Sequence, residues 1–362
     1  MKSKINVLIS NLGLPYRGIG SWTYEICFFL EKNDTIDFIL SPTSNPDNRY
    51  IFCEKKPWPK LSKFNRSYFL KHSVAADYIK FLLKLAQKRT PLHILVLDDQ
   101  NLLEAIVNSK SQFPSGSIVT FYHHGHSLSW NPTFQEKIDQ VLFLTQMGYL
   151  DTLKSSERFL PEVKIIGNGV DSKLFFPLSK TEKMSKRKLF GLDENDIVIS
   201  WMANSRPVKG LHLFLKMMPQ LLEINESIKI LIIGNKQSVE TSSRIIQTGQ
   251  IDSHKVSEYL QISDFYFFTS LWKEGFGLSL VEAVKCGNFI LASQNGGIPD
   301  VLSGYSRSKL IPFPNIIDAW IQAFKACLVE NVLESQLLNP SFDFHDYHNM
   351  DDWEKRFKKV FE

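Results

Sequence analysis

The sequence predicts an α/β protein made of two doubly wound domains, each with a parallel sheet between helices. Short apolar runs typical of buried strands alternate with amphipathic helical patterns, and this alternation starts twice, near residue 5 and near residue 197. The chain has 362 residues, which is more than one ordinary core requires. Two domains of about 150–180 residues are therefore expected.

The first series of elements begins at the N-terminus. The run INVLIS (5–10) is a predicted strand, and the glycine-rich turn after it leads to an amphipathic helix over 22–33 with Ser21 as a candidate N-cap. Further strands of this half are predicted at 36–41, 93–98, 117–122 and 140–145.

The second series starts with a predicted strand at 197–203, a turn (NSRPVKG) and an amphipathic helix at 211–225. Segment 171–196 is polar and basic in its middle, and we expect it to be an interdomain connection. The last residues, 351–362, form an amphipathic helix whose apolar face must pack on another element. Further strands of this half are predicted at 228–234, 264–270 and 288–293.

Composition excludes several classes of protein. A net charge of +4 does not indicate a nucleic-acid-binding protein. The four cysteines contain no CxxC pair and are expected to be reduced and buried, as in a cytosolic protein. The N-terminal apolar run is too short for a signal peptide, and no stretch reaches the ~18–20 apolar residues of a membrane span. A cytosolic protein is expected, and peripheral contact with a membrane surface stays open.

Two glutamates, Glu274 and Glu282, flank a glycine-rich turn in the stretch EGFGLSLVE. Because the glycines interrupt the helical pattern, we expect a loop and then a helix that begins near Leu278. Gly287 is a natural residue to follow the end of this helix. Glu274 then lies just before the helix, and Glu282 lies about one turn inside it.

The start of this helix suits a phosphate, because the amides of Phe276, Gly277 and Leu278 point out of its N-terminus. Carboxylates repel phosphate, so Glu274 and Glu282 are expected to bind neutral hydroxyls on either side of it. A sugar joined to a nucleoside through a diphosphate offers hydroxyls at both ends and charge in the middle. The alternative is an acid that complements the helix dipole and a solvated helix glutamate.

Two cations, Arg206 and Lys209, lie on the turn after the first strand of the second series. Cations at such a place can clamp a diphosphate and neutralise the charge of a leaving group. Arginine and lysine on a loop are also commonly just solvated.

Together these motifs resemble the retaining GT-B glycosyltransferases of family 4. The segment NGVD…F.P, the turn R..KG (206–210), the E-x7-E motif and NGGIPDVL (295–302) all match, with Asp300 in place of the usual glutamate. The closing DDWEKRFKKVFE is similar to the family's final helix. The similarity is strong over about 165–302 and at the tail, and it is loose over 1–160.

The resemblance implies two Rossmann-like doubly wound domains that face a central cleft. By analogy, residues 1–172 form an acceptor-binding domain and residues 173–340 form a nucleotide-sugar-binding domain. Residues 341–362 form a C-terminal helix that packs back on the first domain.

The resemblance also implies residue roles. Arg206 and Lys209 would bind the donor diphosphate, Glu274 the transferred sugar and Glu282 the ribose. The turn YRGIGS looks like the family's glycine-rich loop near the donor phosphate or the acceptor, although it lacks the third glycine of a dinucleotide fingerprint and also fits a tight turn. The expected donor-binding residues are Gly18, Gly20, Arg206, Lys209, Glu274, Gly275, Phe276, Gly277, Leu278 and Glu282.

Three histidines follow a predicted strand in TFYHHGHSLSW, where the family carries a functional histidine near the transferred sugar. The pair HG favours His124, then His123, with His126 as a third candidate. Each also fits a loop or core histidine. The expected catalytic residues are His124, His123, Glu274, Arg206 and Lys209.

No metal or other cofactor is expected. The spacing of the three histidines does not match a zinc site, and no cysteine or carboxylate completes one. The chain has no Asp-x-Asp motif, and the Asp-Asp of LDDQ (97–100) is interpreted as a helix cap.

Segment 53–72 mixes basic and aromatic residues, which suits an anionic membrane surface or a phosphorylated lipid acceptor. The alternative is a solvated loop and helix. The residues concerned are Lys55, Lys56, Lys60, Lys63, Arg66 and Lys71 with Trp58, Phe64, Tyr68 and Phe69.

The predicted function is transfer of a sugar from a UDP- or GDP-sugar to a glycan or a lipid-linked saccharide, with retention of configuration. By analogy the setting is bacterial surface polysaccharide or lipopolysaccharide synthesis, in the cytoplasm or at the inner face of the membrane. Two alternatives stay open. One is a non-catalytic sugar-nucleotide-binding partner subunit, and the other is a GT-B glycosyl phosphorylase, which needs a pyridoxal-phosphate lysine that the sequence does not reveal.

Overall fold

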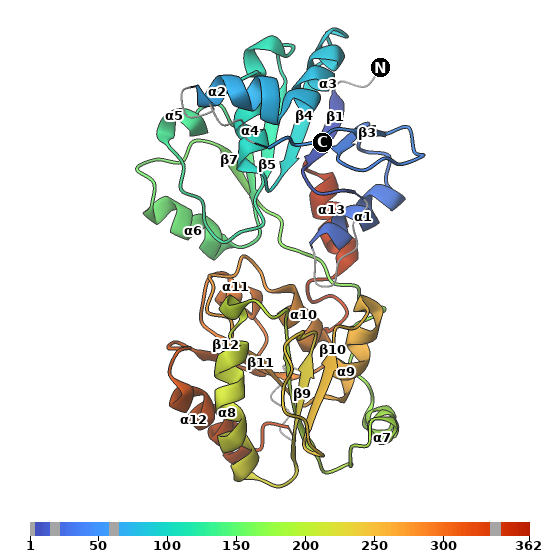
Figure 1. Cartoon of the computed structure of the whole chain (residues 1–362), viewed down its shortest axis with the longest axis vertical. Coiled ribbons are helices and arrows are strands. Elements are labelled where there is room, and N and C mark those ends of the chain that lie inside the picture. The colour runs from blue at the N-terminus through green and yellow to red at the C-terminus, as the bar shows by residue number, and fades with distance from the viewer. Residues whose placement is uncertain (1–3, 15–21, 58–64, 334–341) are drawn as a thin grey trace. The chain divides into compact units, whose positions relative to one another are not determined.

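The computed structural model describes residues 4–14, 22–57, 65–333 and 342–362 (Figure 1). The chain divides into two compact units, which are described separately. The first comprises Met1–Gly167 and Trp353–Glu362, and the second comprises Asn168–Asp352.

The first unit contains a parallel sheet with the strand order β3-β2-β1-β4-β5-β6-β7. The order reverses between β1 and β4, and ligands of doubly wound sheets bind outside the carboxyl ends of strands at such a point. The strands are β1 (Ile5–Ser10), β2 (Phe38–Ser41), β3 (Tyr50–Phe52), β4 (Leu92–Leu97), β5 (Ile118–Tyr122), β6 (Gln140–Phe143) and β7 (Glu162–Ile165).

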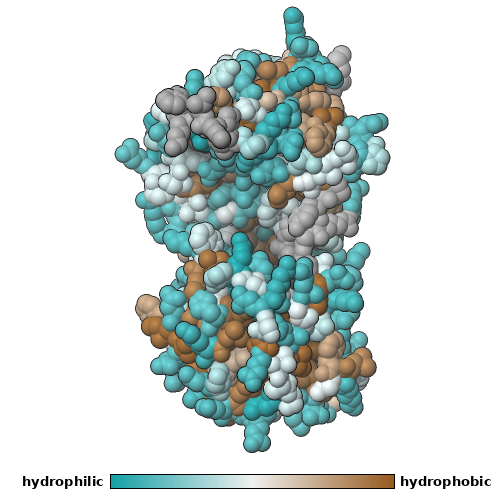
Figure 2. Space-filling model, viewed as in Figure 1, coloured by the Kyte–Doolittle hydropathy of each residue, from teal (hydrophilic) through white to brown (hydrophobic). Residues whose placement is uncertain are grey.

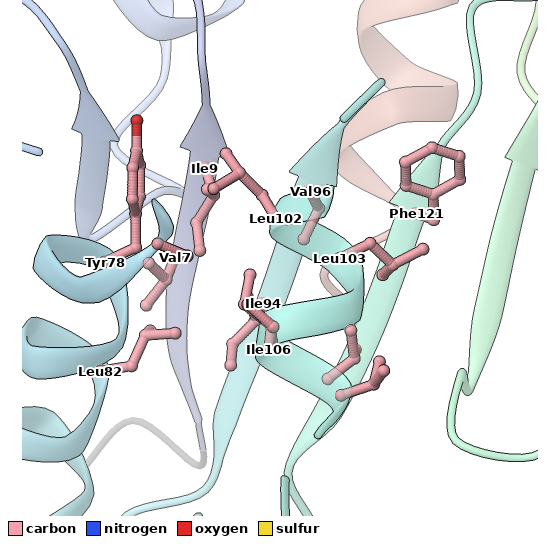
Figure 3. Packing of buried hydrophobic residues seen from close by; sticks show 14 of the residues in the cluster. Val7, Ile9, Tyr78, Leu82, Ile94, Val96, Leu102, Leu103, Ile106 and Phe121 are labelled. Atoms are coloured by element: carbon pink, nitrogen blue, oxygen red, sulfur yellow. The ribbon is translucent and has the colours of Figure 1, made fainter. Parts of the chain in front are cut away.

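Helices pack on this sheet, and Figure 3 shows α3 and α4 covering β1, β4 and β5 with buried aliphatic side chains. Asp99 caps α4, because its side chain accepts hydrogen bonds from the amides of Asn101 and Leu102, so half of the cap prediction for LDDQ is confirmed. The helices are α1 (Thr23–Lys32), α2 (Arg66–Phe69), α3 (Ala76–Ala86), α4 (Gln100–Val107), α5 (Pro132–Gln135) and α6 (Gln146–Lys154), with a π-helical turn η1 (Leu70–Val74) and a 3₁₀ turn η2 (Lys110–Gln112).

The end of the chain belongs to the first unit. Phe357, on α13 (Met350–Lys358), packs edge-on against Phe29 of α1 with ring centroids 4.8 Å apart. Trp353 Nε1–H donates to the Tyr122 hydroxyl at 3.3 Å. Four apolar residues of the predicted C-terminal helix 351–362 are buried: Trp353, Phe357, Val360 and Phe361.

The second unit contains a parallel sheet with the order β10-β9-β8-β11-β12-β13, and the order reverses between β8 and β11. Its strands are β8 (Ile197–Met202), β9 (Ile228–Ile233), β10 (Ile245–Gly249), β11 (Phe265–Phe268), β12 (Phe289–Ser293) and β13 (Ser308–Ile311). Its helices are α7 (Lys180–Leu189), α8 (Leu211–Ile224), α9 (Val256–Ile262), α10 (Leu278–Lys285), α11 (Ile298–Val301) and α12 (Ile317–Val329), with 3₁₀ turns η3 (Pro207–Lys209) and η4 (Ser253–Lys255). The fold class predicted from the sequence is confirmed.

Each predicted strand coincides, within a few residues, with a strand that has a neighbouring strand on both sides in its sheet. The prediction missed β3, β7, β10 and β13, and these are the four edge strands of the two sheets. Their side chains are mostly exposed or only partly buried. An edge strand therefore lacks the continuous apolar run that identifies a central strand of a parallel sheet.

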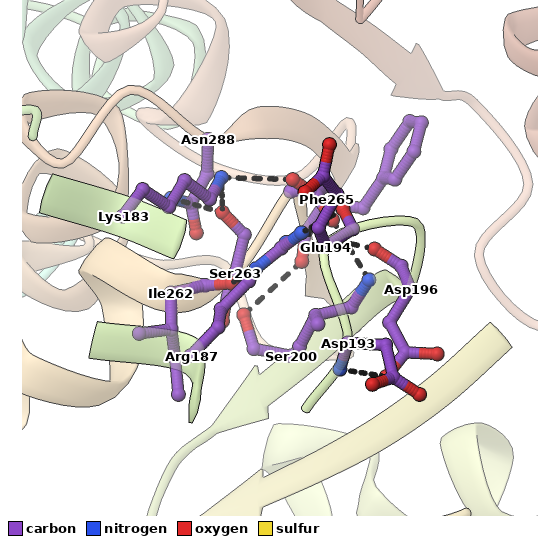
Figure 4. A network of polar contacts seen from close by, with 12 residues as sticks. Lys183, Arg187, Asp193, Glu194, Asp196, Ser200, Ile262, Ser263, Phe265 and Asn288 are labelled. Atoms are coloured by element: carbon purple, nitrogen blue, oxygen red, sulfur yellow. Dashed lines mark hydrogen bonds and ion pairs between the residues drawn. The ribbon is translucent and has the colours of Figure 1, made fainter. Parts of the chain in front are cut away.

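Segment 171–196 was predicted to be an interdomain connection, and the structure shows that it contains the helix α7 and belongs to the second unit. Figure 4 shows the polar network that holds α7 on the second unit. Asp264 accepts from Arg187 Nη2 at 2.5 Å and from Lys183 Nζ at 2.8 Å, and Arg187 also donates to the carbonyl oxygen of Ile262. Since ionic contacts rather than an apolar stripe attach α7, hydrophobic periodicity could not reveal it.

Within the described ranges, no helix is both long and apolar enough to cross a bilayer. Figure 2 shows mainly hydrophilic side chains on the visible face, with hydrophobic ones interspersed. The four cysteines are free and buried, as the sequence predicted: Cys27, Cys53, Cys286 and Cys327.

Candidate functional site

The second unit places two loops of the predicted site side by side where its strand order reverses. The turn after β8 carries Arg206 and Lys209, and the loop after β11 carries Glu274. Lys209 Nζ donates to Glu274 Oε1 at 2.7 Å, and the two side chains are only 19% and 11% exposed. The fold thus forms a partly buried ion pair between residues 65 positions apart in the sequence.

Ser270 also contacts this pair, although no sequence motif indicated it. Its hydroxyl donates to the same Oε1 atom of Glu274 at 2.5 Å. No described residue donates a hydrogen bond to Glu274 Oε2. That oxygen can therefore accept a hydrogen bond from a ligand hydroxyl.

Two glycines allow the backbones of the site to approach closely. Gly210 has φ +75°, and a Cβ atom there would lie 2.0 Å from the carbonyl oxygen of Thr269. Gly296 has φ +62°, and its Cβ would lie 2.4 Å from the carbonyl oxygen of Glu274. Any larger residue at either position would push apart the loops that hold Lys209 and Glu274.

Helix α10 begins at Leu278, as predicted, after Gly277 with φ +87°. The amides of Phe276, Gly277 and Leu278 donate to no other group in the described parts of the chain. Such orphan N–H groups at a helix start carry partial positive charge and bind anions. The helix ends before Gly287 (φ +83°), which confirms the predicted end residue.

Glu282 lies on α10, about one turn from its start. Burial raises the pKa of its carboxyl from the usual 4.5 to about 7. Its side chain makes no hydrogen bond or ion pair with any described residue. A partly buried carboxyl group with a perturbed pKa and no partner is typical of a ligand-binding position.

Arg206 lies apart from this pair. It is exposed, and its guanidinium Nε donates to Asn204 Oδ1 at 3.3 Å. The turn keeps its backbone close to that of Lys209, because the Lys209 amide donates to the Arg206 carbonyl oxygen at 2.9 Å. The structure therefore puts both cations on one turn, but only Lys209 contacts Glu274.

The histidines of the first unit follow β5, where two of them share one partner. Asp98 Oδ1 lies 3.3 Å from His123 Nδ1 and accepts from the His124 amide at 3.1 Å. His126 instead pairs with Asp151 of α6, at 2.9 Å from its Nε2 atom. The interpretation of Asp98 as a helix cap is wrong, since its neighbour Asp99 caps α4.

The ring of His124 lies between two aromatic rings. Its centroid is 3.8 Å from that of Trp22, in a stacked arrangement, and 4.0 Å from that of Tyr122. Burial lowers the pKa of His124 to about 3, so the imidazole is neutral at pH 7. Both of its buried ring nitrogens, and Nε2 of His123, have no hydrogen-bond partner in the part of the chain that is described. A neutral imidazole in this state can donate to one hydroxyl and accept from another.

Burial alone would raise the pKa of Asp98. The hydrogen bond from His123 and the nearby histidines outweigh burial, so this pKa is lowered. Asp98 is therefore an ionised acceptor at neutral pH, which favours a proton on His123 Nδ1.

Several predicted residues lie outside the described ranges. These are Gly18, Ile19, Gly20 and Ser21 of the glycine-rich loop and Trp58, Lys60, Lys63 and Phe64 of segment 53–72. Three basic residues of that segment form ion pairs, which reduces the charge available to an anionic surface: Lys55 with Asp99, Lys56 with Asp77 and Arg66 with Glu104. Contact with a membrane stays a prediction.

The expectation that no metal is bound also stays a prediction. Among the residues that the structure describes, no three histidine, cysteine, aspartate or glutamate side chains are placed to hold a metal ion.

Two parallel doubly wound sheets, one in each unit, define the GT-B fold class. Residues 182–337 match the family described as Glycosyl transferases group 1. This match confirms the resemblance to the family that the sequence motifs indicated.

Among curated proteins, the chain is similar to the phosphatidylinositol N-acetylglucosaminyltransferase GPI3 subunit of Saccharomyces cerevisiae, with 26% identity over 236 residues, 62% of this chain and 50% of that protein. It is similar to the GDP-mannose-dependent monoacylated alpha-(1-6)-phosphatidylinositol monomannoside mannosyltransferase of Corynebacterium glutamicum, with 24% identity over 222 residues, 55% of this chain and 58% of that one. The chain thus spans 50–58% of the length of these relatives.

Among solved structures, Anabaena HepE in complex with UDP superposes with a TM-score of 0.70 at 15% identity, covering 99% of each chain. This similarity shows the fold.

Proposed function

We propose that this protein transfers a sugar from a nucleoside-diphosphate sugar to a glycan or a lipid-linked saccharide. The observation that carries this proposal is the Lys209–Glu274 pair beside the unpaired amides that start α10. A cation and amides suit a diphosphate, and a carboxylate with a free oxygen suits sugar hydroxyls. The match of residues 182–337 to the family described as Glycosyl transferases group 1 supports the same activity.

In the proposed reaction, the acceptor oxygen forms a bond to the anomeric carbon as the bond from that carbon to the diphosphate oxygen breaks. Attack occurs from the face of the leaving group, so configuration is retained, and the departing phosphate takes the acceptor's proton. Lys209, Arg206 and the amides of 276–278 stabilise the charge that grows on the diphosphate. Glu274 orients the transferred sugar and is not a nucleophile.

The other residues bind hydroxyls. Glu282 is proposed to accept from the ribose, because its carboxylate has no partner among the described residues. In the first unit, His124 is proposed to bind a sugar hydroxyl, with His123 held by Asp98 as the second candidate.

The names of the relatives indicate which donors and acceptors to test first. One relative is named for GDP-mannose and a structural neighbour was solved with UDP, so UDP- and GDP-sugars are the donors to test first. Both curated relatives are named for phosphatidylinositol-based acceptors, which supports a lipid-linked acceptor. We propose a peripheral site of action at the inner face of the membrane, in surface polysaccharide or glycolipid synthesis.

Thermal unfolding with UDP, GDP and ADP, each with and without EDTA, tests the donor site. A nucleotide at 100 times its dissociation constant stabilises the folded state by about 2.7 kcal/mol, which is a rise of a few degrees for a chain of this size. We expect a shift with one base only and no effect of EDTA. The absence of a shift with every nucleotide would contradict the proposal.

Turnover separates this proposal from its alternatives. Release of the nucleoside diphosphate from a bound nucleotide sugar, coupled to glycosylation of an added acceptor, is expected for a transferase. Nucleotide binding without turnover would favour a binding subunit. Absorbance of pyridoxal phosphate in the purified protein would favour a phosphorylase.

A pH titration tests Glu282. Since a carboxylate accepts from ribose hydroxyls better than a carboxylic acid does, nucleotide affinity should rise as pH rises through about 7. The Glu282→Gln variant should bind more weakly and lack this pH step. Calorimetric titration between pH 6 and 8 measures both, with Glu258→Gln on the exposed face of α9 as the control. A pH step that survives in Glu282→Gln would assign it to another group.

The Glu282 carboxyl group also makes the free energy of unfolding depend on pH, in a direction that its raised pKa determines. Its folded pKa is raised, so its stabilising effect is complete below the unfolded pKa of 4.5 and is lost as pH rises through about 7. Above pH 7, Glu282→Gln is therefore expected to be more stable than the parent protein, by about 1–3 kcal/mol. Urea unfolding at pH 5 and pH 8 compares the two, and an equal difference at both values would contradict this.

A further inference from the structure

Lys285, the last residue of α10, is completely buried. Its ammonium donates to three backbone carbonyl oxygens: Phe344 at 2.8 Å, His345 at 3.0 Å and Tyr347 at 2.7 Å. Lysine is almost never fully buried without such partners. All three N–H bonds of the side chain are thus used within the protein, so Lys285 cannot itself bind a ligand.

The residues that Lys285 holds, 344–348, are here called the strap. The strap also contacts the opposite end of α10, because the ring of His348 packs edge-on against Phe276 with centroids 5.1 Å apart. His348 Nε2 lies 3.2 Å from the carbonyl oxygen of Val301, which also accepts from the Tyr347 hydroxyl. The strap therefore links the end of α10 to the turn at its start and to α11.

The 274–278 turn needs contacts with other segments of the chain to keep one conformation. Gly277, with φ +87°, and Gly275 on either side of Phe276 give it conformational freedom, and no side chain caps α10. Phe276 is buried, and its amide is one of the three unpaired donors. The packing of His348 on the Phe276 ring restricts where this amide can point.

We infer that Lys285 is a positioning residue of the donor site: it anchors the strap, and the strap fixes the 274–278 turn in the orientation that binds the diphosphate. The inference about diphosphate binding rests on the proposed function. The inference that Lys285 orders the turn does not.

Two variants test this. Lys285→Met keeps the apolar stem and removes all three hydrogen bonds. Tyr347→Phe is milder, since it removes only the hydroxyl bond between the strap and Val301. Lys216→Met, on the exposed face of α8, is the matched control. Each full-length variant is examined by hydrogen exchange without ligand and by calorimetric titration with UDP and GDP, well below its melting temperature.

In Lys285→Met we expect faster exchange of the amides that donate to carbonyl oxygens of the turn, which are those of Leu280, Val281 and Gly297. We also expect a rise of about 10- to 100-fold in the dissociation constant of the bound nucleotide. Tyr347→Phe should show smaller changes of the same kind. Lys216→Met should show neither. Should Lys285→Met not fold, Tyr347→Phe decides the question alone.

The outcomes separate the two proposals. Lower melting temperatures with unchanged exchange of these amides and unchanged affinity would mean that Lys285 is merely structural, and the inference would be overturned. Faster exchange of these amides in the variants, with no nucleotide bound even by the parent protein, would support positioning of the turn and contradict the proposed function.

Discussion

Replacement of Lys209 by alanine is expected to lower kcat by about 100- to 1,000-fold, because the growing charge on the leaving diphosphate then loses its partly buried cation. The protein should still fold, since Ser270 continues to donate to Glu274 Oε1. Steady-state kinetics with the donor identified by thermal shift, together with a melting curve, provide the measurement. Lys216→Ala, exposed on the helix that follows the same turn, is the control.

The Glu274→Gln variant is to be measured by the same steady-state kinetics. Its amide can still bind a sugar hydroxyl, but it cannot pair with the Lys209 ammonium 2.7 Å away. If the two residues act as one unit, the double variant should be little worse than Lys209→Ala alone. Near-normal turnover in either single variant would remove that residue from the proposed mechanism.

Replacement of Asp264 by alanine is expected to lower the stability of the second unit by about 3–5 kcal/mol, the usual cost of removing one partner from a buried ion pair. Asp264 pairs with both Lys183 and Arg187 and accepts from the Val198 amide at 2.8 Å. Its loss leaves the nearly buried Arg187 charge without its carboxylate partner. Urea unfolding measures the change, and Lys188→Ala, exposed on α7, is the control.

The loss of stability in Asp264→Ala should depend on pH. Burial by itself raises the pKa of Asp264, but the charges of Lys183 and Arg187 outweigh it and the pKa is lowered. A lowered pKa gives stability that is present above the unfolded value of 3.8 and is lost as pH falls through the folded value. The difference between parent and Asp264→Ala should therefore be full at pH 7 and shrink below pH 3.8. A loss under 1 kcal/mol at pH 7 would mean that α7 is held mainly by other contacts.

The sequence could predict those parts of the site whose interacting residues are close together along the chain. The start of α10 at Leu278 and its end before Gly287 were predictable, because each depends on glycine conformations within a few residues. Ser270 and Lys285 were not predictable. Ser270 bonds to Glu274 through a loop shape, and Lys285 reaches carbonyl groups about 60 residues further on.

The first unit shows the same limit. His123 and His124 were identified from their place after a strand, but Asp98 was interpreted as part of a helix cap. It bonds to the histidines instead, because the carboxyl ends of β4 and β5 are neighbours in the sheet. Strand order is a long-range property that no local pattern contains.

The sequence by itself determined the two α/β series, the central strands and the local form of the E-x7-E turn. Buried parallel strands have continuous apolar runs, and turns need glycine at fixed positions, so both are written in neighbouring residues. Only the tertiary structure decided the edge strands, the attachment of α7, the pairing of Lys209 with Glu274 and the burial of Lys285. Each of these depends on which distant segments meet, and there a charged side chain is stabilised by partners that its own neighbourhood in the sequence does not supply.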